Sequence, residues 1–164
     1  MKPVFIDPIV WAAQEKVLLS WVGTPYKWLQ KAKGGGADCT TYITESFVES
    51  GFLERFDFPE TYPQDWFVQD PKDDFIINHL QDNFDKNTPP GYKWVLEDPG
   101  RTYVRGDILL FKVFKKLEMV SHTTVYMGNN EMLHNVRKQK VRLITFDYRW
   151  KKYCTGVYRL YYGE

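Results

Sequence analysis

The hydrophobic and polar positions divide the chain into a helical first part, an irregular middle and a strand-like last part. Apolar residues recur with helix-like spacing over residues 8–22, where Asp7 suits the N-cap and Pro8 suits the first helical position. A second stretch of this kind covers residues 39–50. We therefore expect two helices in the first fifty residues, joined by a short extended piece and a flexible triple-glycine turn at residues 34–36.

Residues 52–103 lack a sustained period, and six prolines interrupt them. One short helix fits residues 75–84, with Ile76, Ile77 and Leu80 facing inward. The rest indicates an ordered loop, because aromatic residues are uncommon in disordered linkers and this range is rich in them, for example Trp66, Phe67, Tyr92 and Trp94. We expect an irregular insertion here, within a single domain that spans residues 1–164.

From residue 104 onward the pattern is strand-like. Two of the runs flank Gly128-Asn129-Asn130, a sequence typical of a tight hairpin turn. Helices followed by a series of antiparallel strands indicate an α+β fold. The β-rich runs that we expect to form this sheet cover residues 107–114, 120–127, 131–136, 141–144 and 156–162.

Composition narrows the class of protein. The 164 residues suffice for one domain with a core, and the hydrophobic share of 43% is ordinary for a soluble chain. The formal net charge of +1, without a long basic run, gives no footprint of a nucleic-acid binder. No segment approaches the roughly 20 apolar residues of a membrane span. The first residues lack the apolar segment of a signal peptide, so we expect synthesis in the cytoplasm.

Of the two cysteines, Cys39 stands at a position that suits a catalytic nucleophile. It follows the glycine turn and begins the second predicted helix, for which Asp38 is the N-cap and Gly51 the stop. A helix N-terminus favours a thiolate, and free amides there could form an oxyanion hole. The alternative is a buried structural cysteine, the role we expect for Cys154. A disulfide between the two is allowed by number, but a reduced state is the better default.

Two histidines complete a candidate site. His122 and His134 lie on the two strands of the predicted hairpin, so they come close if the register keeps both on one face. His122 would deprotonate Cys39, and His134 would hydrogen-bond the far nitrogen of His122 and fix its tautomer. The alternative is a metal pair with Cys39 as third ligand, but no dense Cys/His spacing supports it, and we expect no metal or cofactor. We interpret His79 as a surface residue.

Five short blocks, in this order, resemble those of the NlpC/P60 family of papain-like cysteine peptidases, which mostly cut peptidoglycan stem peptides. The resemblance covers about residues 8–50 and 104–162. The blocks are Gly23-Thr24-Pro25-Tyr26, Asp38-Cys39-Thr40, Gly106-Asp107-Ile108-Leu109-Leu110-Phe111, Ser121-His122, and Tyr126-Met127-Gly128 with Met132-Leu133-His134.

The resemblance implies a papain-like fold, with N-terminal helices packed on a small barrel-like antiparallel sheet. It implies Cys39 as nucleophile, His122 as base and His134 as the orienting residue. It places Tyr26 near the oxyanion or substrate and gives Asp38 a part in binding a free amino end, with N-capping as the plain alternative. The resemblance also implies that the protein acts on a peptidoglycan-derived peptide and needs no cofactor.

The chain also departs from the family pattern. Thr40-Thr41 stands where Ser-Gly is usual, so the substrate contacts of Thr40 are open. The interval from Cys39 to His122 is long because of the insertion, which could be a lid, a substrate wall or a docking surface. Residues 62–66 are similar to a segment of small phage-encoded members, which suggests a phage or cell-wall assembly partner, and association with a virion or release to the wall.

Two other functions stay open. One keeps the fold but changes the reaction, to an acyltransferase or a deamidase acting on a lipid or protein amide. An apolar cleft closed to a branched peptide would favour it. The other is a non-catalytic module of a phage tail, which the intact set of Cys39, His122 and His134 disfavours.

Overall fold

The computed structural model describes residues 1–59, 63–64, 66, 74–100, 102–114 and 118–163. The helical elements are η1 (Val4–Ile6), α1 (Pro8–Leu19), α2 (Thr41–Glu49), α4 (Phe75–Asn87) and α5 (Tyr148–Lys151). The strands are β1 (Lys2–Pro3), β2 (Lys31–Ala32), β3 (Gly36–Ala37), β4 (Tyr92–Glu97), β5 (Ile108–Phe111), β6 (His122–Gly128), β7 (Glu131–His134), β8 (Arg142–Thr145) and β9 (Cys154–Tyr162).

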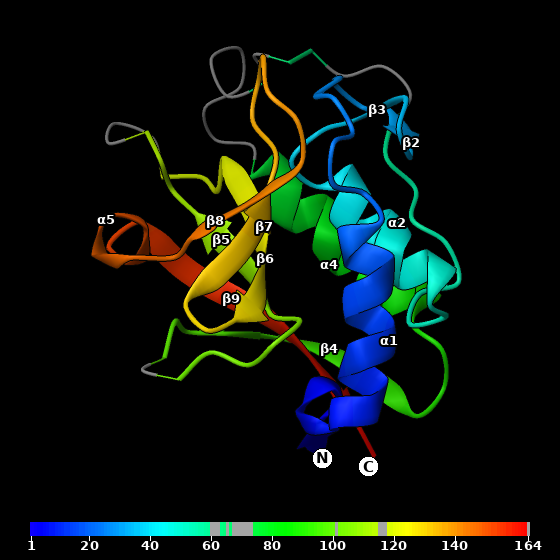
Figure 1. Cartoon of the computed structure of the whole chain (residues 1–164). Coiled ribbons are helices and arrows are strands. Elements are labelled where there is room, and N and C mark those ends of the chain that lie inside the picture. The colour runs from blue at the N-terminus through cyan, green and yellow to red at the C-terminus, as the bar shows by residue number, and fades with distance from the viewer. Residues whose placement is uncertain (60–62, 65, 67–73, 101, 115–117, 164) are drawn as a thin grey trace.

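Seven strands form one antiparallel sheet in which β9-β5-β6-β7-β8 are successive neighbours. β9 has neighbours on both sides: β4 pairs along one side, and β5 and β1 pair along the other. Both β1 and β4 pair with Tyr161 and Tyr162, so they lie on opposite sides of β9. The described strands leave the sheet open rather than closed into a barrel. Helices α1, α2 and α4 lie together on one side of it, as Figure 1 shows. The α+β prediction is confirmed.

The strand β5 is buried on both of its faces, and all four of its residues are apolar. Ile108 and Leu110 belong to the main core, which the helices cover. Leu109 and Phe111 point the other way, into a smaller core with Phe146. Successive residues of a strand face opposite sides, so a strand covered on both faces, such as β5, is apolar at every position.

The first helix begins where the sequence indicates. The Asp7 side chain accepts hydrogen bonds from Ile9 N and Val10 N, at 2.8 and 3.1 Å, and Pro8 is the first helical residue. The helix ends at Leu19 rather than Val22, because the chain turns toward Gly23, whose φ of +91° suits glycine. Gly34 and Gly35 lie in the turn of the β2–β3 hairpin, and Gly36 is the first residue of β3.

The middle of the chain contains more structure than its pattern predicts. The helix expected at residues 75–84 is present and continues to Asn87. The strand β4 lies where the pattern predicts a loop, and it pairs residue by residue with β9. Residues 60–62, 65, 67–73 and 101 of the expected insertion lie outside the described residues, and so do Tyr62 and Asp65 of the segment similar to phage members.

Candidate active site

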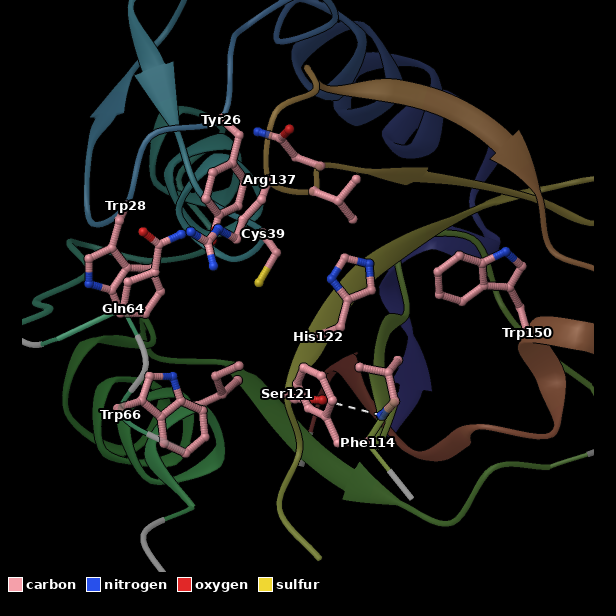
Figure 2. Close-up of a pocket in the computed structure, with 14 residues that line it drawn as sticks. Tyr26, Trp28, Cys39, Gln64, Trp66, Phe114, Ser121, His122, Arg137 and Trp150 are labelled. Atoms are coloured by element: carbon pink, nitrogen blue, oxygen red, sulfur yellow. Dashed lines mark hydrogen bonds between the residues drawn. The ribbon is translucent and has the colours of Figure 1, made fainter. Parts of the chain in front are cut away.

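Cys39 and His122 line one pocket of about 400 Å³. Cys39 comes from the segment that precedes α2, and His122 is the first residue of β6. In Figure 2 the Cys39 side chain and the His122 imidazole lie next to one another and both border the same pocket. The structure thus brings the predicted nucleophile and base to a single site.

Cys39 lies in a turn before the helix and not, as predicted, on the helix itself, which begins at Thr41. The carboxylate of Asp38 makes this turn. Its Oδ1 accepts from Thr40 N and Thr41 N, at 2.8 and 2.9 Å, and its Oδ2 accepts from Leu29 N at 3.0 Å. The N-cap of α2 is Thr40 and not, as predicted, Asp38, whose side chain instead holds the turn before the helix and ties it to the loop at Leu29.

A chain of hydroxyl groups connects Cys39 to β6. Thr123 Oγ1 donates to the Cys39 carbonyl at 2.6 Å, which uses its only proton. Thr40 Oγ1 must therefore donate to Thr123 Oγ1, 2.9 Å away. The thiol of Cys39 is then the donor in its 3.6 Å contact with Thr40 Oγ1. The resting thiol proton is thus directed at Thr40.

The hairpin register places both histidines on the same face of the sheet. Val125 pairs with Leu133, so His134 stands opposite Thr124, two residues from His122. Residues two apart on a strand share a face. The rings of His122 and His134 meet edge to face, with centroids 5.7 Å apart. The hairpin that brings the two histidines together is confirmed.

The predicted hydrogen bond between the two histidines is not formed in this structure. His122 Nε2 and both ring nitrogens of His134 are buried and have no hydrogen-bond partner. Trp150, from α5, covers the pair instead, with its ring 5.8 Å from that of His122 and 5.7 Å from that of His134. The three rings form a compact triangle around these buried nitrogens.

Burial makes the neutral forms of thiol and imidazole the stable ones. It raises the pKa of Cys39 to about 11, helped by the Asp38 carboxylate, and lowers the pKa of His122 to about 3, helped by His134. Burial, followed by the charge of Arg142, lowers the pKa of His134 to about 4. These directions run against the expected preference for thiolate, because desolvation outweighs the effect of a helix that begins two residues later.

Of the three predicted substrate-binding residues, only Tyr26 lines the pocket with Cys39. Burial above all raises the pKa of the Tyr26 hydroxyl, which therefore remains a proton donor. Asp38 and Thr40 are 2% exposed, and their polar atoms are engaged with the backbone and with Thr123. The backbone N–H of Thr40 is likewise used by Asp38, so it is unavailable for the expected oxyanion hole.

Two further hydrogen bonds, which no pattern in the sequence indicates, tie the nucleophile segment to β7. The Tyr42 hydroxyl donates to the Leu133 carbonyl at 2.6 Å, and Asn135 Nδ2 donates to the Ala37 carbonyl at 2.8 Å. Leu133 and Asn135 flank His134, so these bonds fix the helix start relative to the histidine strand. Asn135 also lines the pocket, and its Oδ1 is buried without a partner.

The walls of the pocket are mainly apolar. Aromatic side chains surround the thiol, and a few polar residues lie at its edge (Figure 2). The wall residues other than those already named are Trp28, Gln64, Trp66, Ile76, Val113, Phe114, Ser121, Val136 and Arg137.

The alternative of a metal site finds no cluster to support it. In the described ranges, no group of three or more His, Cys, Asp or Glu side chains could hold a metal ion. None of the helices in that part of the chain has the length and apolar character needed to cross a membrane.

The two other residues considered in the sequence analysis, Cys154 and His79, lie outside the candidate active site. Cys154 is a free, buried thiol next to the carbonyl of Gly156, 3.6 Å away. His79, at a partly exposed position of α4, packs edge to face on Phe75, with ring centroids 4.4 Å apart.

Comparison with known proteins supports the resemblance noted in the sequence. The family model of the NlpC/P60 family matches residues 23–159. Comparison with curated protein sequences gives no match.

Three solved structures are similar to the chain. The NlpC/P60 domain of the peptidoglycan hydrolase SagA has 16% identity and a TM-score of 0.54, over 90% of this chain and 96% of that one. An NlpC/P60 family protein of Bacillus cereus has 18% identity and a TM-score of 0.59, over 90% of this chain and 39% of that one. The peptidoglycan hydrolase RipB of Mycobacterium tuberculosis has 18% identity and a TM-score of 0.51, over 91% of this chain and 63% of that one.

These likenesses concern the fold. The chain spans nearly all of the SagA domain but about two fifths of the Bacillus cereus protein. The family match spans the nucleophile turn, both histidine strands and most of β9. The chain belongs to the NlpC/P60 family.

Proposed function

We propose that the protein is a cysteine-dependent peptidase or amidase that hydrolyses peptide or isopeptide bonds in peptidoglycan stem peptides. The observation that carries this proposal is the meeting of Cys39 and His122 in one pocket of an NlpC/P60 chain. Two of the similar structures, those of SagA and RipB, are of peptidoglycan hydrolases, which supports the choice of substrate.

The first step forms a thioester. His122 accepts the thiol proton as Cys39 Sγ attacks the carbonyl carbon of the scissile amide, and the carbonyl oxygen becomes an oxyanion. Because the resting pair is neutral, this proton transfer accompanies the attack rather than preceding it. The tetrahedral intermediate then collapses, the C–N bond breaks, and His122 gives the proton to the leaving amine.

The second step is hydrolysis. A water molecule loses a proton to His122 and attacks the thioester, which releases the carboxylic acid and restores the thiol. The donors proposed for the oxyanion are the Tyr26 hydroxyl and the backbone N–H of Cys39, which donates to no other described residue. Asn135 Oδ1 could accept an N–H of the substrate, since it lies on the pocket without a partner.

His134 is proposed as the orienting residue of a Cys39–His122–His134 triad. A small rotation of either ring would join them by a hydrogen bond once His122 takes up a proton, because the rings already touch. Asp38 and Thr40 hold the nucleophile turn in this scheme. A direct contact of Asp38 with a free amino end stays a prediction, as does a phage or cell-wall assembly partner.

Turnover of defined wall peptides tests the proposal. We expect the wild-type chain to release peptide fragments, detected by mass spectrometry, and Cys39→Ala to lose activity by about 10,000-fold or more while keeping its unfolding midpoint. Cys154→Ala is the matched control and should keep full activity. Cleavage by Cys39→Ala at the wild-type rate would exclude the thiol mechanism.

The apolar pocket wall favours one second candidate, acyl transfer or deamidation on the same fold. Trp28, Trp66 and Phe114 suit an acyl chain or a hydrophobic side chain better than a charged stem peptide. The two candidates separate by product: an acyl-enzyme that is intercepted by an added amine indicates transfer, and one that yields only the free acid indicates hydrolysis. A chain in which Cys39 forms no acyl-enzyme with either substrate would match the non-catalytic docking module.

A further inference from the structure

A second hollow lies beside the active site and is lined by cations. It has a volume of about 550 Å³, and its walls are Gly23, Pro25, Lys138, Gln139, Lys140 and Arg142. No acidic side chain of the described residues lines it. Arg137, the preceding residue, lines the active-site pocket, so one basic segment borders both cavities. We call Arg137, Lys138, Lys140 and Arg142 the basic rim.

The basic rim is held in place by the backbone. The turn between β7 and β8 is hydrogen-bonded to the segment before β2, through Gly23 N to Val141 O and Tyr26 N to Gln139 O, both at 2.9 Å. Figure 1 shows this turn at the same end of the molecule as the β2–β3 hairpin. The rim is therefore a preformed surface that adjoins the catalytic pocket at Arg137.

The charges of the rim are not used by the fold. All four side chains are exposed, and none forms a salt bridge with any residue in the described ranges. Residues 132–146 contain no Asp or Glu, and neither do residues 23–37, which add Lys27, Lys31 and Lys33. Of these three lysines, Lys31 and Lys33 are paired, with Glu45 and Glu49 of α2. Like charges gathered without counterions weaken a fold, so this arrangement calls for an external anion.

We infer that the basic rim binds a polyanion, a polymer with repeated phosphate or carboxylate groups that runs past the mouth of the active site. Four exposed cations spread over six residues suit several anionic groups in succession better than one small anion, for which a buried polar cradle is usual. The net charge of +1 gives little long-range attraction, so we expect the contact to be local. The identity of the polymer rests on the proposed function: an anionic polymer of the cell wall would hold the enzyme beside its peptide bonds.

Binding can be measured apart from turnover in the full chain carrying Cys39→Ala. Polyphosphate and poly-L-glutamate serve as phosphate and carboxylate probes, each at about 50 and 200 mM salt. We expect Lys138→Glu with Lys140→Glu to weaken binding of at least one probe about tenfold or more. The control, Lys16→Glu with Lys93→Glu, makes the same change of charge on α1 and β4, and should bind as Cys39→Ala alone does.

Insoluble wall material then distinguishes the source of the anion. Loss of binding after acid removal of phosphodiester polymers assigns the phosphate polymer, and retention assigns the carboxylates of the peptides. Equal weakening by both double variants, or no binding of either probe at low salt, would overturn the inference. Tighter binding of a single-stranded oligonucleotide to the same rim would overturn the wall assignment. If the charge-reversed variant unfolds, Lys138→Gln with Lys140→Gln provides the same comparison.

These outcomes are independent of catalysis. A chain that binds through the rim but cleaves nothing would refute the proposed hydrolysis and leave the rim in place. A chain that cleaves soluble wall peptides but binds neither probe would support the proposed hydrolysis and refute the binding role of the rim.

Discussion

The hydroxyl of Thr123 donates a 2.6 Å hydrogen bond to the carbonyl of Cys39, so the residue beside the candidate base holds the backbone of the candidate nucleophile. Thr123 points to the opposite face of β6 from His122, as successive strand residues do. One strand thus presents the imidazole to the pocket and anchors the thiol segment behind it. The dipeptide His122-Thr123 therefore helps to set the relative position of the two groups, together with the bonds made by Tyr42 and Asn135.

Replacing this anchor should impair the site more than the fold. Thr123→Val keeps the shape of the side chain but leaves the Cys39 carbonyl and the Thr40 hydroxyl without their partner. We expect a loss of about 1–3 kcal/mol in unfolding free energy and a fall in kcat of up to about 100-fold. Thr123→Ser should restore most of both. Urea unfolding and steady-state turnover measure the two effects, and full activity in Thr123→Val would show that the anchor is dispensable.

The thiol of Cys39 should react slowly near neutral pH. Burial raises its pKa to about 11, above the ordinary value for cysteine, and no cation among the described residues compensates. The rate of labelling by iodoacetamide, measured against pH in the Cys154→Ser background, should therefore rise through pH 9 and beyond. His122→Ala should leave this profile nearly unchanged, because the neutral imidazole does not stabilise a thiolate in the free enzyme.

A midpoint below about 8.5 would contradict the neutral pair. If that low midpoint rose in His122→Ala, the free enzyme would contain a thiolate–imidazolium pair, and substrate would meet an already ionised nucleophile.

Stability should fall in mild acid because of the two histidines. The pKa values of His122 and His134 are lowered to about 3 and about 4, whereas an unfolded chain binds these protons near pH 6.5. Between pH 6.5 and 4 the unfolded state therefore holds more protons, and the free energy of unfolding decreases as pH falls. Each histidine contributes up to about 1.4 kcal/mol per pH unit in this window. A His122→Asn/His134→Asn chain should lose less stability from pH 7 to 4.5, as measured by urea unfolding; an equal loss would place the acid sensitivity elsewhere.

Trp150 should control how dry the histidine pair is. Its ring covers both imidazoles, and α5, which carries it, is a single turn. Trp150→Ala would admit water and move the pKa values of both histidines back toward about 6.5. Histidine proton resonances followed by NMR report these values directly. Trp150→Phe, which retains an aromatic ring, is the control, and unchanged resonances in Trp150→Ala would mean that other groups shield the pair.

The parts that sequence reasoning predicted depend on local chemistry. Asp7 and Pro8 mark the start of α1 through bonds within one turn, and the β6–β7 hairpin follows from Asn129 and Asn130, whose φ angles of +53° and +55° suit the turn. Cys39 and His122 were placed in one site because their motifs stand at a helix start and on a strand. Confirmation of the family adds weight to this placement.

The parts that were missed depend on distant partners. Tyr92, Trp94 and Leu96 alternate as a strand should, but prolines on both sides hid β4, which exists through its pairing with β9. The anchors Thr123, Tyr42 and Asn135 have no signature in sequence, because each bonds a carbonyl on another element. The thiolate was expected from the helix alone, and the sequence contains no measure of how deeply Cys39 is buried.

The position of β9 has a consequence for the order in which the chain folds. This strand, at residues 154–162, pairs with β1, β4 and β5, whose residues precede it by between about 40 and 160 positions. Contacts so far apart in sequence close large loops, and such topologies fold slowly. On the ribosome, the nucleophile turn and α2 emerge long before the strand that completes the sheet. The thiol is therefore accessible to solvent and oxidants during synthesis, at least until β6, which carries His122 and Thr123, has emerged and packed against the nucleophile turn.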